Sequence, residues 1–171
     1  LGERAQDVMI SRYGLGKSTE KMTLEAIGKK YGITRERVRQ IENHALQTIR
    51  KSKEFEKEKK VFDELETLMN TLGGIMVEED LLNHVTKDKG THNHLALLLI
   101  LGDRFKKKRE DDHFKHRWYV DDELSEKVHS SLRSLYENLS DEDLISETDI
   151  MTSFLVHLKE VSEEYKKDEI L

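Results

Sequence analysis

The chain of 171 residues contains no cysteine and no proline, and its longest apolar run spans only residues 95–101. Without cysteine, disulfides and thiolate metal sites are excluded, and a reducing compartment is the simplest setting. The apolar run is far shorter than the roughly 20 residues that cross a bilayer, so we expect no membrane partner. The chain begins with Leu1 and shows no signal peptide, which predicts a fragment of a longer cytoplasmic protein.

The charges are distributed unequally along the chain. Residues 1–60 carry 15 Lys and Arg against 9 Asp and Glu, a net charge of +6, whereas residues 61–171 carry 14 against 26, a net charge of −12. The field that a partner meets is local, so the basic N-terminal third can lie on phosphates although the whole chain carries −6. Nucleic acid is therefore a candidate partner for residues 1–60.

Residues 23–42 form the most informative motif of the sequence. Thr23 stands where it would cap a short helix, Gly32 would turn the chain, and Thr34 would cap a longer helix that reaches about residue 50. An earlier helix is expected over residues 5–13. Two helices joined by a glycine-containing turn predict a helix-turn-helix, a motif that reads DNA through its second helix.

The second helix of this motif separates its residues into two faces, at about 100° per residue. The buried stripe is expected to consist of Val38, Ile41, Ala45 and Ile49. The polar residues on the opposite face are expected to be Glu36, Gln40, Asn43 and Gln47. The basic residues at its margins and in the exposed first turn are Arg37, Arg39, Arg50 and Arg35. A merely solvated helix typically alternates Glu and Lys, whereas crowded arginines and glutamines favour contacts with bases and phosphates.

This segment resembles region four of primary-type bacterial sigma factors, the C-terminal domain of these RNA polymerase subunits. The resemblance rests on Thr-Arg-Glu-Arg-Val-Arg-Gln-Ile-Glu at residues 34–42, Thr-Leu-Glu-Ala-Ile-Gly at residues 23–28 and Arg-Tyr-Gly-Leu-Gly at residues 12–16. It covers residues 1–52 and implies binding to the promoter −35 element in the major groove. It also implies docking on the β flap of the RNA polymerase core, so the expected partners are double-stranded promoter DNA and the polymerase.

The resemblance assigns roles to individual residues. Those that it implies as base readers are Arg35, Glu36 and Gln40. It also implies a group of residues that contact the DNA backbone or make adjacent protein contacts: Arg4, Arg12, Thr23, Leu24, Thr34, Arg37 and Arg39. Ala26 departs from the family pattern, in which glutamate is frequent, so a contact through that carboxylate is missing.

A second unit is expected after a charged helical connector at residues 53–60. The apolar spacing predicts helices over residues 61–68, 79–85 and 93–101, and aromatic and basic residues predict a β-hairpin over residues 104–120. Three helices followed by a hairpin is the order of a winged helix. The expected fold class is therefore mainly α: a helix-turn-helix domain, a winged-helix domain at 61–120 and an acidic helical C-terminal segment.

Residues 61–120 also resemble the winged-helix domain of the delta subunit of bacterial RNA polymerase (HARE-HTH type). The residues that carry this fainter resemblance are Gly-Asp-Arg-Phe at 102–105 and Arg-Trp-Tyr at 117–119. Trp118 is expected to fill the space between the wing and the helices.

Two interpretations of the wing are open. The stretch 104–117 holds seven basic residues against three acidic ones. In the first interpretation Lys106, Lys107 and Lys108 contact phosphate; in the second the hairpin is a solvated element in acidic surroundings.

Residues 121–171 carry 15 acidic and 5 basic residues, a net charge of −10, yet keep apolar residues at helical spacing. The stretch 132–158 weakly repeats the pattern of 65–85. The segment is either an independent acidic helical region or a second copy of the winged-helix unit that ends before its wing.

Catalysis and cofactors are not expected. His92, His94, His113 and His116 have spacings that occur easily by chance, and no cysteine or carboxylate completes a recognised metal-ligand set. The sequence also shows no nucleophile–base set and no phosphate-cradling glycine loop.

Two functional hypotheses remain from different classes. In the first, the chain is a sequence-specific DNA-binding module of a sigma factor or sigma-like protein, which reads a −35-like element with RNA polymerase. In the second, it is a protein-interaction regulator of the polymerase, in which the acidic extension masks or displaces nucleic acid.

Overall fold

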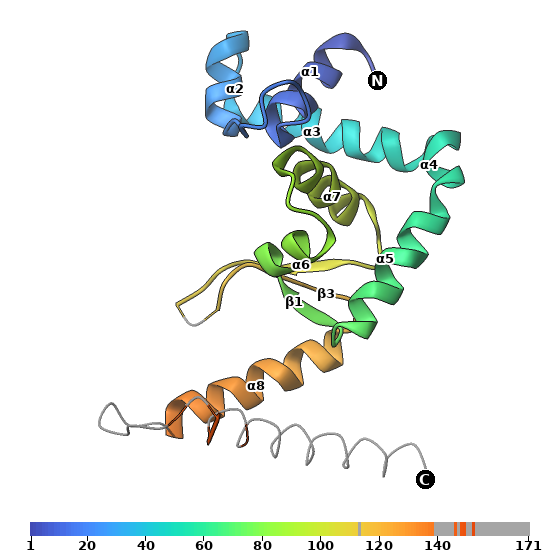
Figure 1. Ribbon diagram of the computed structural model, residues 1–171. Helices are drawn as coiled ribbons and strands as arrows, with labels where there is room; N and C mark the ends of the chain where they lie inside the picture. The colour runs from blue at the N-terminus through green and yellow to red at the C-terminus, as the bar shows by residue number, and fades with distance from the viewer. Residues whose placement is uncertain (113, 139–145, 147, 150–151, 153–171) are drawn as a thin grey trace. The chain divides into compact units, whose positions relative to one another are not determined.

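The computed structural model describes residues 1–112, 114–138, 146, 148–149 and 152. The chain divides into two units, Leu1–Val120 and Asp121–Leu171 (Figure 1). Most of the described residues are helical, and one three-stranded sheet lies in the first unit. The expected mainly α fold class is confirmed.

The first three helices are α1 (Glu3–Tyr13), α2 (Leu24–Tyr31) and α3 (Arg35–Arg50). Their ends are set by local chemistry, as the sequence predicts. The Thr23 and Thr34 side chains accept hydrogen bonds at 3.1 Å from the backbone amides three residues later, which satisfies one free amide of each helix. Gly32 ends α2 with φ +65°, a left-handed conformation that strains residues with a Cβ.

The buried stripe of α3 differs from the expected one. Val38 and Ala45 are fully buried, but Ile41 and Ile49 are only half-buried. Glu42 is buried in the same stripe, with 8 % of its surface exposed. Four residues along a helix advance about 40° beyond one full turn, so Glu42 faces the same side as Val38.

The second set of helices consists of α4 (Lys53–Lys57), α5 (Lys59–Thr71), α6 (Glu78–Val85) and α7 (Lys89–Leu101). The expected connector at 53–60 is thus α4 and the first residues of α5, joined through Glu58. Helix α7 begins before the expected residue 93. The reason is local: the carboxylate of Asp88 accepts a hydrogen bond from the backbone amide of Thr91 at 2.7 Å and caps the helix.

The sheet contains β1 (Ile75–Val77), β2 (Lys106–Lys108) and β3 (Arg117–Tyr119), in the antiparallel order β1-β3-β2. The hairpin β2–β3 lies within the expected stretch 104–120. Strand β1 was not expected, because three residues carry no readable alternation, and its formation depends on pairing with β3, which lies about 40 residues later. The order of helices and strands is that of a winged helix; the relation to the delta subunit stays a prediction.

Trp118 fills the centre of the winged-helix unit, with 2 % of its surface exposed. The expected role of this side chain is therefore confirmed. Burial of an aromatic side chain of this size stabilises the fold by roughly 2–3 kcal/mol. The other buried members of the same core are Phe62, Leu65, Met69, Leu81, Leu82, Leu95, Ala96, Leu99, Leu101 and Phe105.

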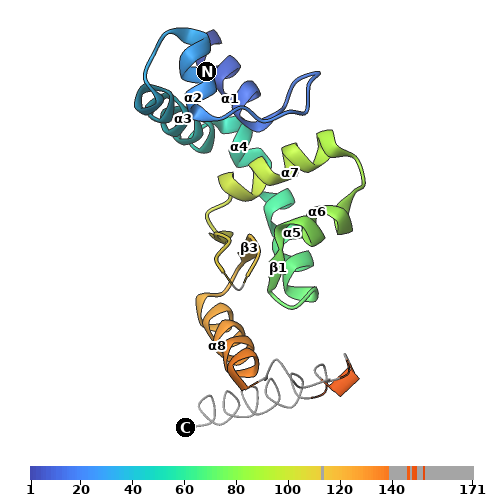
Figure 2. The same cartoon turned by 90° about the vertical axis from the view of Figure 1, so that its left-hand side faces the viewer.

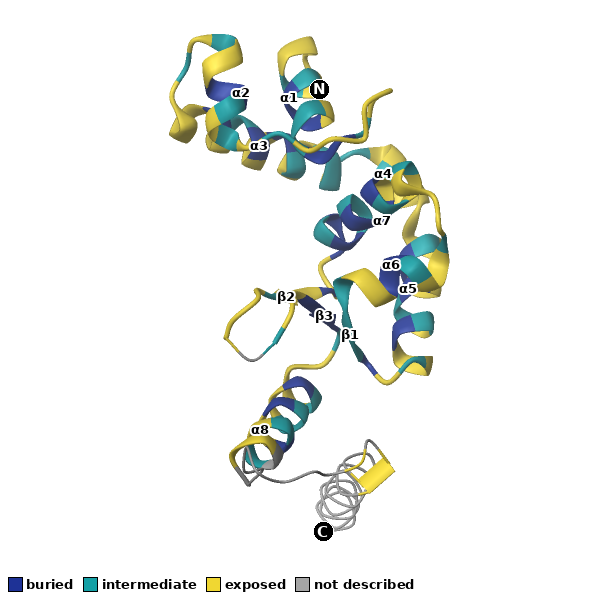
Figure 3. Ribbon diagram, turned by 60° about the vertical axis from the view of Figure 1, so that its left-hand side comes forward, coloured by how far each residue is buried: buried dark blue, intermediate teal, exposed yellow. Residues whose placement is uncertain are grey.

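Helix α7 joins the winged-helix unit to the helix-turn-helix. Figures 1 and 2 show α7 beside the three-helix group, and it contacts both α1 and α3. Met9, Tyr13 and Ala45 form a buried cluster on α1 and α3, and Leu97 and Ile100 of α7 pack against it. The buried segments of α1, α3 and α7 appear dark blue in Figure 3. A continuous apolar junction therefore joins the helix-turn-helix to the winged-helix unit.

The second unit contains helix α8 (Asp122–Asn138). The Asp121 carboxylate accepts hydrogen bonds from the amides of Glu123 and Leu124 at 2.8 and 3.0 Å and so caps the helix. The alternative of a second copy of the winged-helix unit, over residues 132–158, depends largely on residues that lie outside the described ones. In the described part of the chain, no helix is both long and apolar enough to cross a membrane.

Candidate nucleic-acid interface

The turn between α2 and α3 requires two glycines. Gly32 has a left-handed backbone, and a Cβ at Gly28 would lie 2.7 Å from the carbonyl oxygen of Ile33. Gly32 is required for its backbone angle, and Gly28 allows the start of α3 to approach α2 closely. Thr34 then starts α3, and the first turns of that helix are exposed on their polar side.

The three expected base readers, Arg35, Glu36 and Gln40, are exposed on α3. The Glu36 carboxylate accepts two hydrogen bonds from Arg39, at 2.8 and 2.7 Å. Gln40 donates to Glu36 at 3.5 Å and accepts from Arg37 at 3.0 Å. The structure thus links Glu36, Gln40 and the two flanking arginines in one array, while Arg35 lies elsewhere on the same helix.

Hydrogen bonds from Arg39 hold the pKa of Glu36 below its ordinary value; desolvation opposes this shift, and the nearby cations and Gln40 support it. Glu36 is therefore ionised near neutral pH and can accept a hydrogen bond from a base, as cytosine recognition requires. Because the ion pair is exposed to solvent, its bonds are easily exchanged for bonds to a ligand.

A hollow of about 330 Å³ lies beside the first turns of α2 and α3. It is lined by Arg12, Thr23, Leu24, Glu25 and Arg35. Two of these side chains are cationic, and the first amides of α2 have no acceptor within their own helix. A helix N-terminus flanked by arginines is suited to a phosphate group.

Arg12 is oriented in this hollow by two groups. Its Nε donates to the Glu42 carboxylate at 3.2 Å, and its Nη1 donates to the carbonyl oxygen of Met22 at 3.2 Å. The Tyr13 hydroxyl donates to the same Glu42 oxygen at 2.8 Å. Burial, with the Glu42 hydrogen bond second, raises the pKa of Tyr13 well above its ordinary value, so the hydroxyl remains a donor at neutral pH.

A second hollow, of about 680 Å³, is lined by residues that include Arg4, Arg37 and Gln40. Arg35 and Arg37 are two residues apart and project about 200° apart, so the two hollows lie on opposite flanks of α3. Arg4 itself lies 5.5 Å from the ring centroid of Tyr31. The exposed array of Glu36 and Gln40 therefore lies between two arginine-lined hollows.

Glu42 and Arg50 have partners that were not expected from the sequence. The signal for Glu42 was present, because its helical angle lies inside the apolar stripe, where an unpaired carboxylate would be costly. Arg50 was expected at the margin of the reading face. Its guanidinium instead donates to the carbonyl oxygens of Ile100 and Leu101 at 2.6 and 3.0 Å, because α7 covers that end of α3.

The basic residues of the wing have partners within the winged-helix unit. Lys107 forms an ion pair with Glu78 and lies 5.3 Å from the ring centroid of Trp118. Burial favours a higher pKa for Glu78, but hydrogen bonds from Lys107 and Trp118 outweigh it and lower the pKa. Arg104 pairs with two acidic residues of α5. These contacts within the unit favour the second interpretation, the hairpin as an element without phosphate contacts. The contact of Lys106, Lys107 and Lys108 with phosphate stays a prediction.

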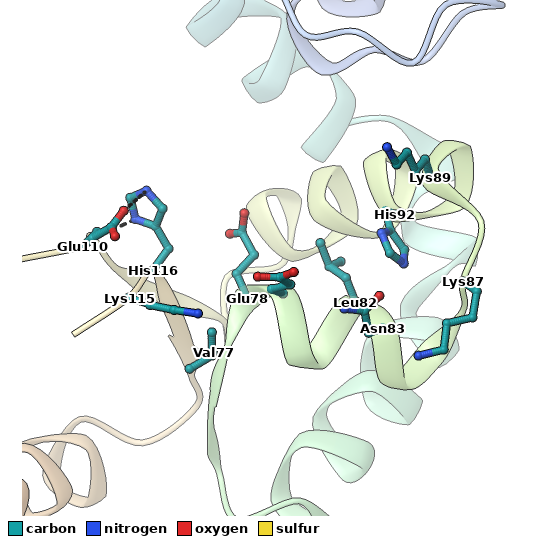
Figure 4. A pocket seen from close by; sticks show the side chains of 11 residues that line it. Val77, Glu78, Leu82, Asn83, Lys87, Lys89, His92, Glu110, Lys115 and His116 are labelled. Carbon is teal, nitrogen blue, oxygen red and sulfur yellow. Dashed lines mark hydrogen bonds and ion pairs between the residues drawn. The ribbon is translucent and has the colours of Figure 1, made fainter.

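A third hollow, of about 520 Å³, opens between α6, the start of α7 and the base of the wing (Figure 4). His92 and His116 both line it. His92 already bonds the carbonyl oxygen of Thr86 at 2.7 Å, and His116 accepts from the amide of Glu110 at 2.8 Å. Among the residues that the structure describes, no group of three or more His, Asp or Glu is arranged to hold a metal ion.

Comparison with known proteins matches residues 1–51 to the family described as Sigma-70, region 4. The chain is 55 % identical over 56 residues to RNA polymerase sigma factor RpoS of Coxiella burnetii. The aligned stretch covers 33 % of this chain and 16 % of that protein. The chain is 45 % identical over 51 residues to the principal sigma factor HrdD of Streptomyces viridifaciens, covering 30 % of this chain and 15 % of that protein. With SigA of a Bacillus species the identity is 48 % over 50 residues, covering 29 % and 13 %.

The chain thus aligns with only a small part of the length of these sigma factors. The matched part contains α1, α2 and α3 with both arginine-lined hollows and the exposed array of α3. Residues 1–51 are thus a segment of the sigma-70 region 4 type.

Proposed function

We propose that residues 1–52 read a promoter −35-like element in the major groove, as part of a protein that acts with RNA polymerase in the bacterial cytoplasm. The observation that carries this proposal is the exposed Glu36–Gln40 array of α3 between two arginine-lined hollows. The array offers the hydrogen-bonding groups that distinguish base pairs, and the hollows offer cationic groups on both flanks of the array. Arg35, Glu36 and Gln40 are the base readers in this proposal.

Arg4, Arg12, Arg37 and Arg39 support the DNA backbone in this proposal, and Thr23, Leu24 and Thr34 shape the helix N-termini beside it. Charge neutralisation of phosphates releases counterions, so affinity falls steeply with salt. Because the array on α3 carries the sequence preference, loss of a backbone contact weakens binding without changing the preferred sequence.

The test is a binding selection from random duplexes with the full chain, followed by the same selection with Gln40→Ala and Glu36→Ala. Loss of a bidentate base contact relaxes preference at one base pair by roughly 1–3 kcal/mol. Gln6→Ala is the matched control, because Gln6 is an exposed glutamine on α1 outside the array. An unchanged preference in both α3 variants contradicts the assignment.

The proposed protein partner is the core RNA polymerase, through its β flap. Support comes from the match to Sigma-70, region 4 and from relatives that are themselves RNA polymerase sigma factors. Binding of the purified chain to core polymerase, and competition by an isolated β flap fragment, would support this partner. Absence of binding to both contradicts it.

A second candidate function is regulation by the acidic extension. The net charge of −12 on residues 61–171 favours it, because such a segment competes with phosphates for the cations of residues 1–60. The variant Asp141→Asn/Glu142→Gln/Asp143→Asn removes three of these charges. If the extension masks the reader, this variant binds DNA more tightly than the unmodified chain, and most strongly at low salt; equal affinity at all salt concentrations contradicts masking.

A further inference from the structure

The segment between α1 and α2, residues 14–23, has few hydrogen bonds of its own. The amide of Leu15 donates to Ile10 at 3.1 Å, and the amide of Met22 donates to Ser11 at 2.9 Å. Residues 16–21 between these points are exposed. A polar loop with so little internal bonding depends on outside contacts for a fixed conformation.

The outside contact is Asn93, in α7 of the winged-helix unit. Its side-chain Nδ2 donates to the carbonyl oxygen of Gly14 at 3.0 Å and to that of Thr19 at 2.8 Å. Both hydrogens of the amide are used, and only 6 % of the residue is exposed. One buried side chain thus joins the beginning and the middle of the loop.

The loop is shaped for this contact. Gly14 has φ +64°, and a Cβ there would lie 2.7 Å from Asn93 Nδ2 and 2.6 Å from the Thr19 carbonyl oxygen. A residue other than glycine would therefore displace the Asn93 side chain as well as strain the backbone. The glycine fits the close approach of α7.

Asn93 is itself held in place by the apolar junction. Leu97 and Ile100, on the same helix, pack against the buried cluster of Met9, Tyr13 and Ala45. At the end of α7, Arg50 donates to two carbonyl oxygens of that helix. Helix α7 is thus fixed against the helix-turn-helix by its apolar side chains and by the hydrogen bonds from Arg50.

The loop leads directly to the hollow beside the first turns of α2 and α3. The carbonyl oxygen of Met22 accepts the hydrogen bond that orients Arg12, and Thr23 caps α2. Both residues follow within four positions of Thr19, the second acceptor of Asn93. A displacement of the loop at Thr19 is therefore transmitted to the hollow that Arg12, Thr23 and Leu24 line.

We propose that Asn93 is a positioning residue, through which the winged-helix unit holds the loop 14–23 in the conformation that binds the DNA backbone. This proposal rests on the proposed DNA-binding function of residues 1–52. It assigns the winged-helix unit a role in ordering the reader, because an ordered loop pays less entropy on binding.

The experiment compares the full chain with Asn93→Ala and Asn93→Asp, the second of which keeps the shape of the side chain but loses the two amide hydrogens. Hydrogen exchange measures the protection of the Leu15 and Met22 amides, and DNA affinity is measured over a range of salt concentrations. We expect lost protection in the loop, roughly tenfold weaker DNA binding and a salt slope smaller by about 0.9, the value of one phosphate contact. The selected DNA sequence stays unchanged, because α3 is not altered.

Two control variants separate positioning from general stability. Leu65→Ala weakens the core of the winged-helix unit, and Leu65 belongs to a different buried cluster from the one that Leu15 of the loop packs against. It should lower the melting temperature while the salt slope stays unchanged. Asn70→Ala removes an exposed asparagine from α5 and should change neither quantity.

The outcomes distinguish this proposal from the one on which it rests. Wild-type loop protection and salt slope in Asn93→Ala overturn the role of Asn93 while DNA binding stands. If the unmodified chain binds no DNA, the proposed function fails, and hydrogen exchange still reports whether Asn93 orders the loop. If both variants unfold, hydrogen exchange of the unmodified chain decides. Unprotected Leu15 and Met22 amides in that chain refute the positioning role of Asn93.

Discussion

Replacement of Glu42 by alanine is expected to destabilise the reader through a buried hydrogen bond rather than through its ion pair. Glu42 accepts from the Tyr13 hydroxyl at 2.8 Å in a buried position and from Arg12 at 3.2 Å. The unpaired tyrosine hydroxyl costs roughly 1–3 kcal/mol. The Arg12 side chain is 35 % exposed, so loss of the screened ion pair adds at most about 1 kcal/mol. The expected total is about 1–4 kcal/mol.

The assay measures the free energy of unfolding in urea, with circular dichroism as the signal. The variants are Glu42→Ala, Glu42→Gln, Tyr13→Phe and the double variant Glu42→Ala/Tyr13→Phe. Glutamine keeps an acceptor for Tyr13 but loses charge assistance, so its cost is expected to be about half that of alanine. The double-mutant cycle should give a coupling of roughly 1–2 kcal/mol between Glu42 and Tyr13. A coupling near zero, with Glu42→Ala as stable as the unmodified chain, refutes the reasoning.

The remaining predictions concern charge and pH. Because the pKa of Tyr13 is raised, its contribution to stability is fully present below pH 10, the ordinary pKa of tyrosine, and is lost as the pH rises further. The melting temperature, measured over an alkaline pH range, should show this decline, and Tyr13→Phe should remove the decline. Arg12→Ala should lower the slope of log affinity against log salt by about 0.9, with Arg104→Ala as the control whose slope equals that of the unmodified chain. Glu78→Ala leaves the indole N–H of Trp118 without its acceptor and should lower the free energy of unfolding by roughly 1–3 kcal/mol, measured by thermal unfolding. Because the pKa of Glu78 is lowered, this contribution is present above pH 4.5 and is lost as the pH falls. A difference in stability between the variant and the unmodified chain that does not change with pH contradicts this prediction.

The caps and turns of the reader follow from local chemistry. Thr23, Thr34 and Gly32 act on amides and dihedral angles within four residues of themselves, so the printed sequence is enough to place them. The exposure of Glu36 and Gln40 follows from the helical angle in the same way. For these features, the sequence and the structure agree because no distant residue takes part.

Other features depend on partners far along the chain. Strand β1 exists because it pairs with β3, which lies about 40 residues later. Arg50 has the same helical angle that the sequence implies, but α7 occupies the space beside it and takes its hydrogen bonds. A helical wheel gives the direction of a side chain and not the neighbour that it meets there.

The helix-turn-helix of residues 1–52, and the exposure of Arg35, Glu36 and Gln40 on its second helix, can be derived from the printed residues, because periodicity and capping act over one or two turns. The contacts behind that helix come from the folding of the whole unit. Folding joins Arg12 to Glu42 across 30 residues and Asn93 to Gly14 across 79 residues. These contacts form where apolar faces of α1, α3 and α7 meet, and burial of those faces is a property of the folded chain and not of any one segment.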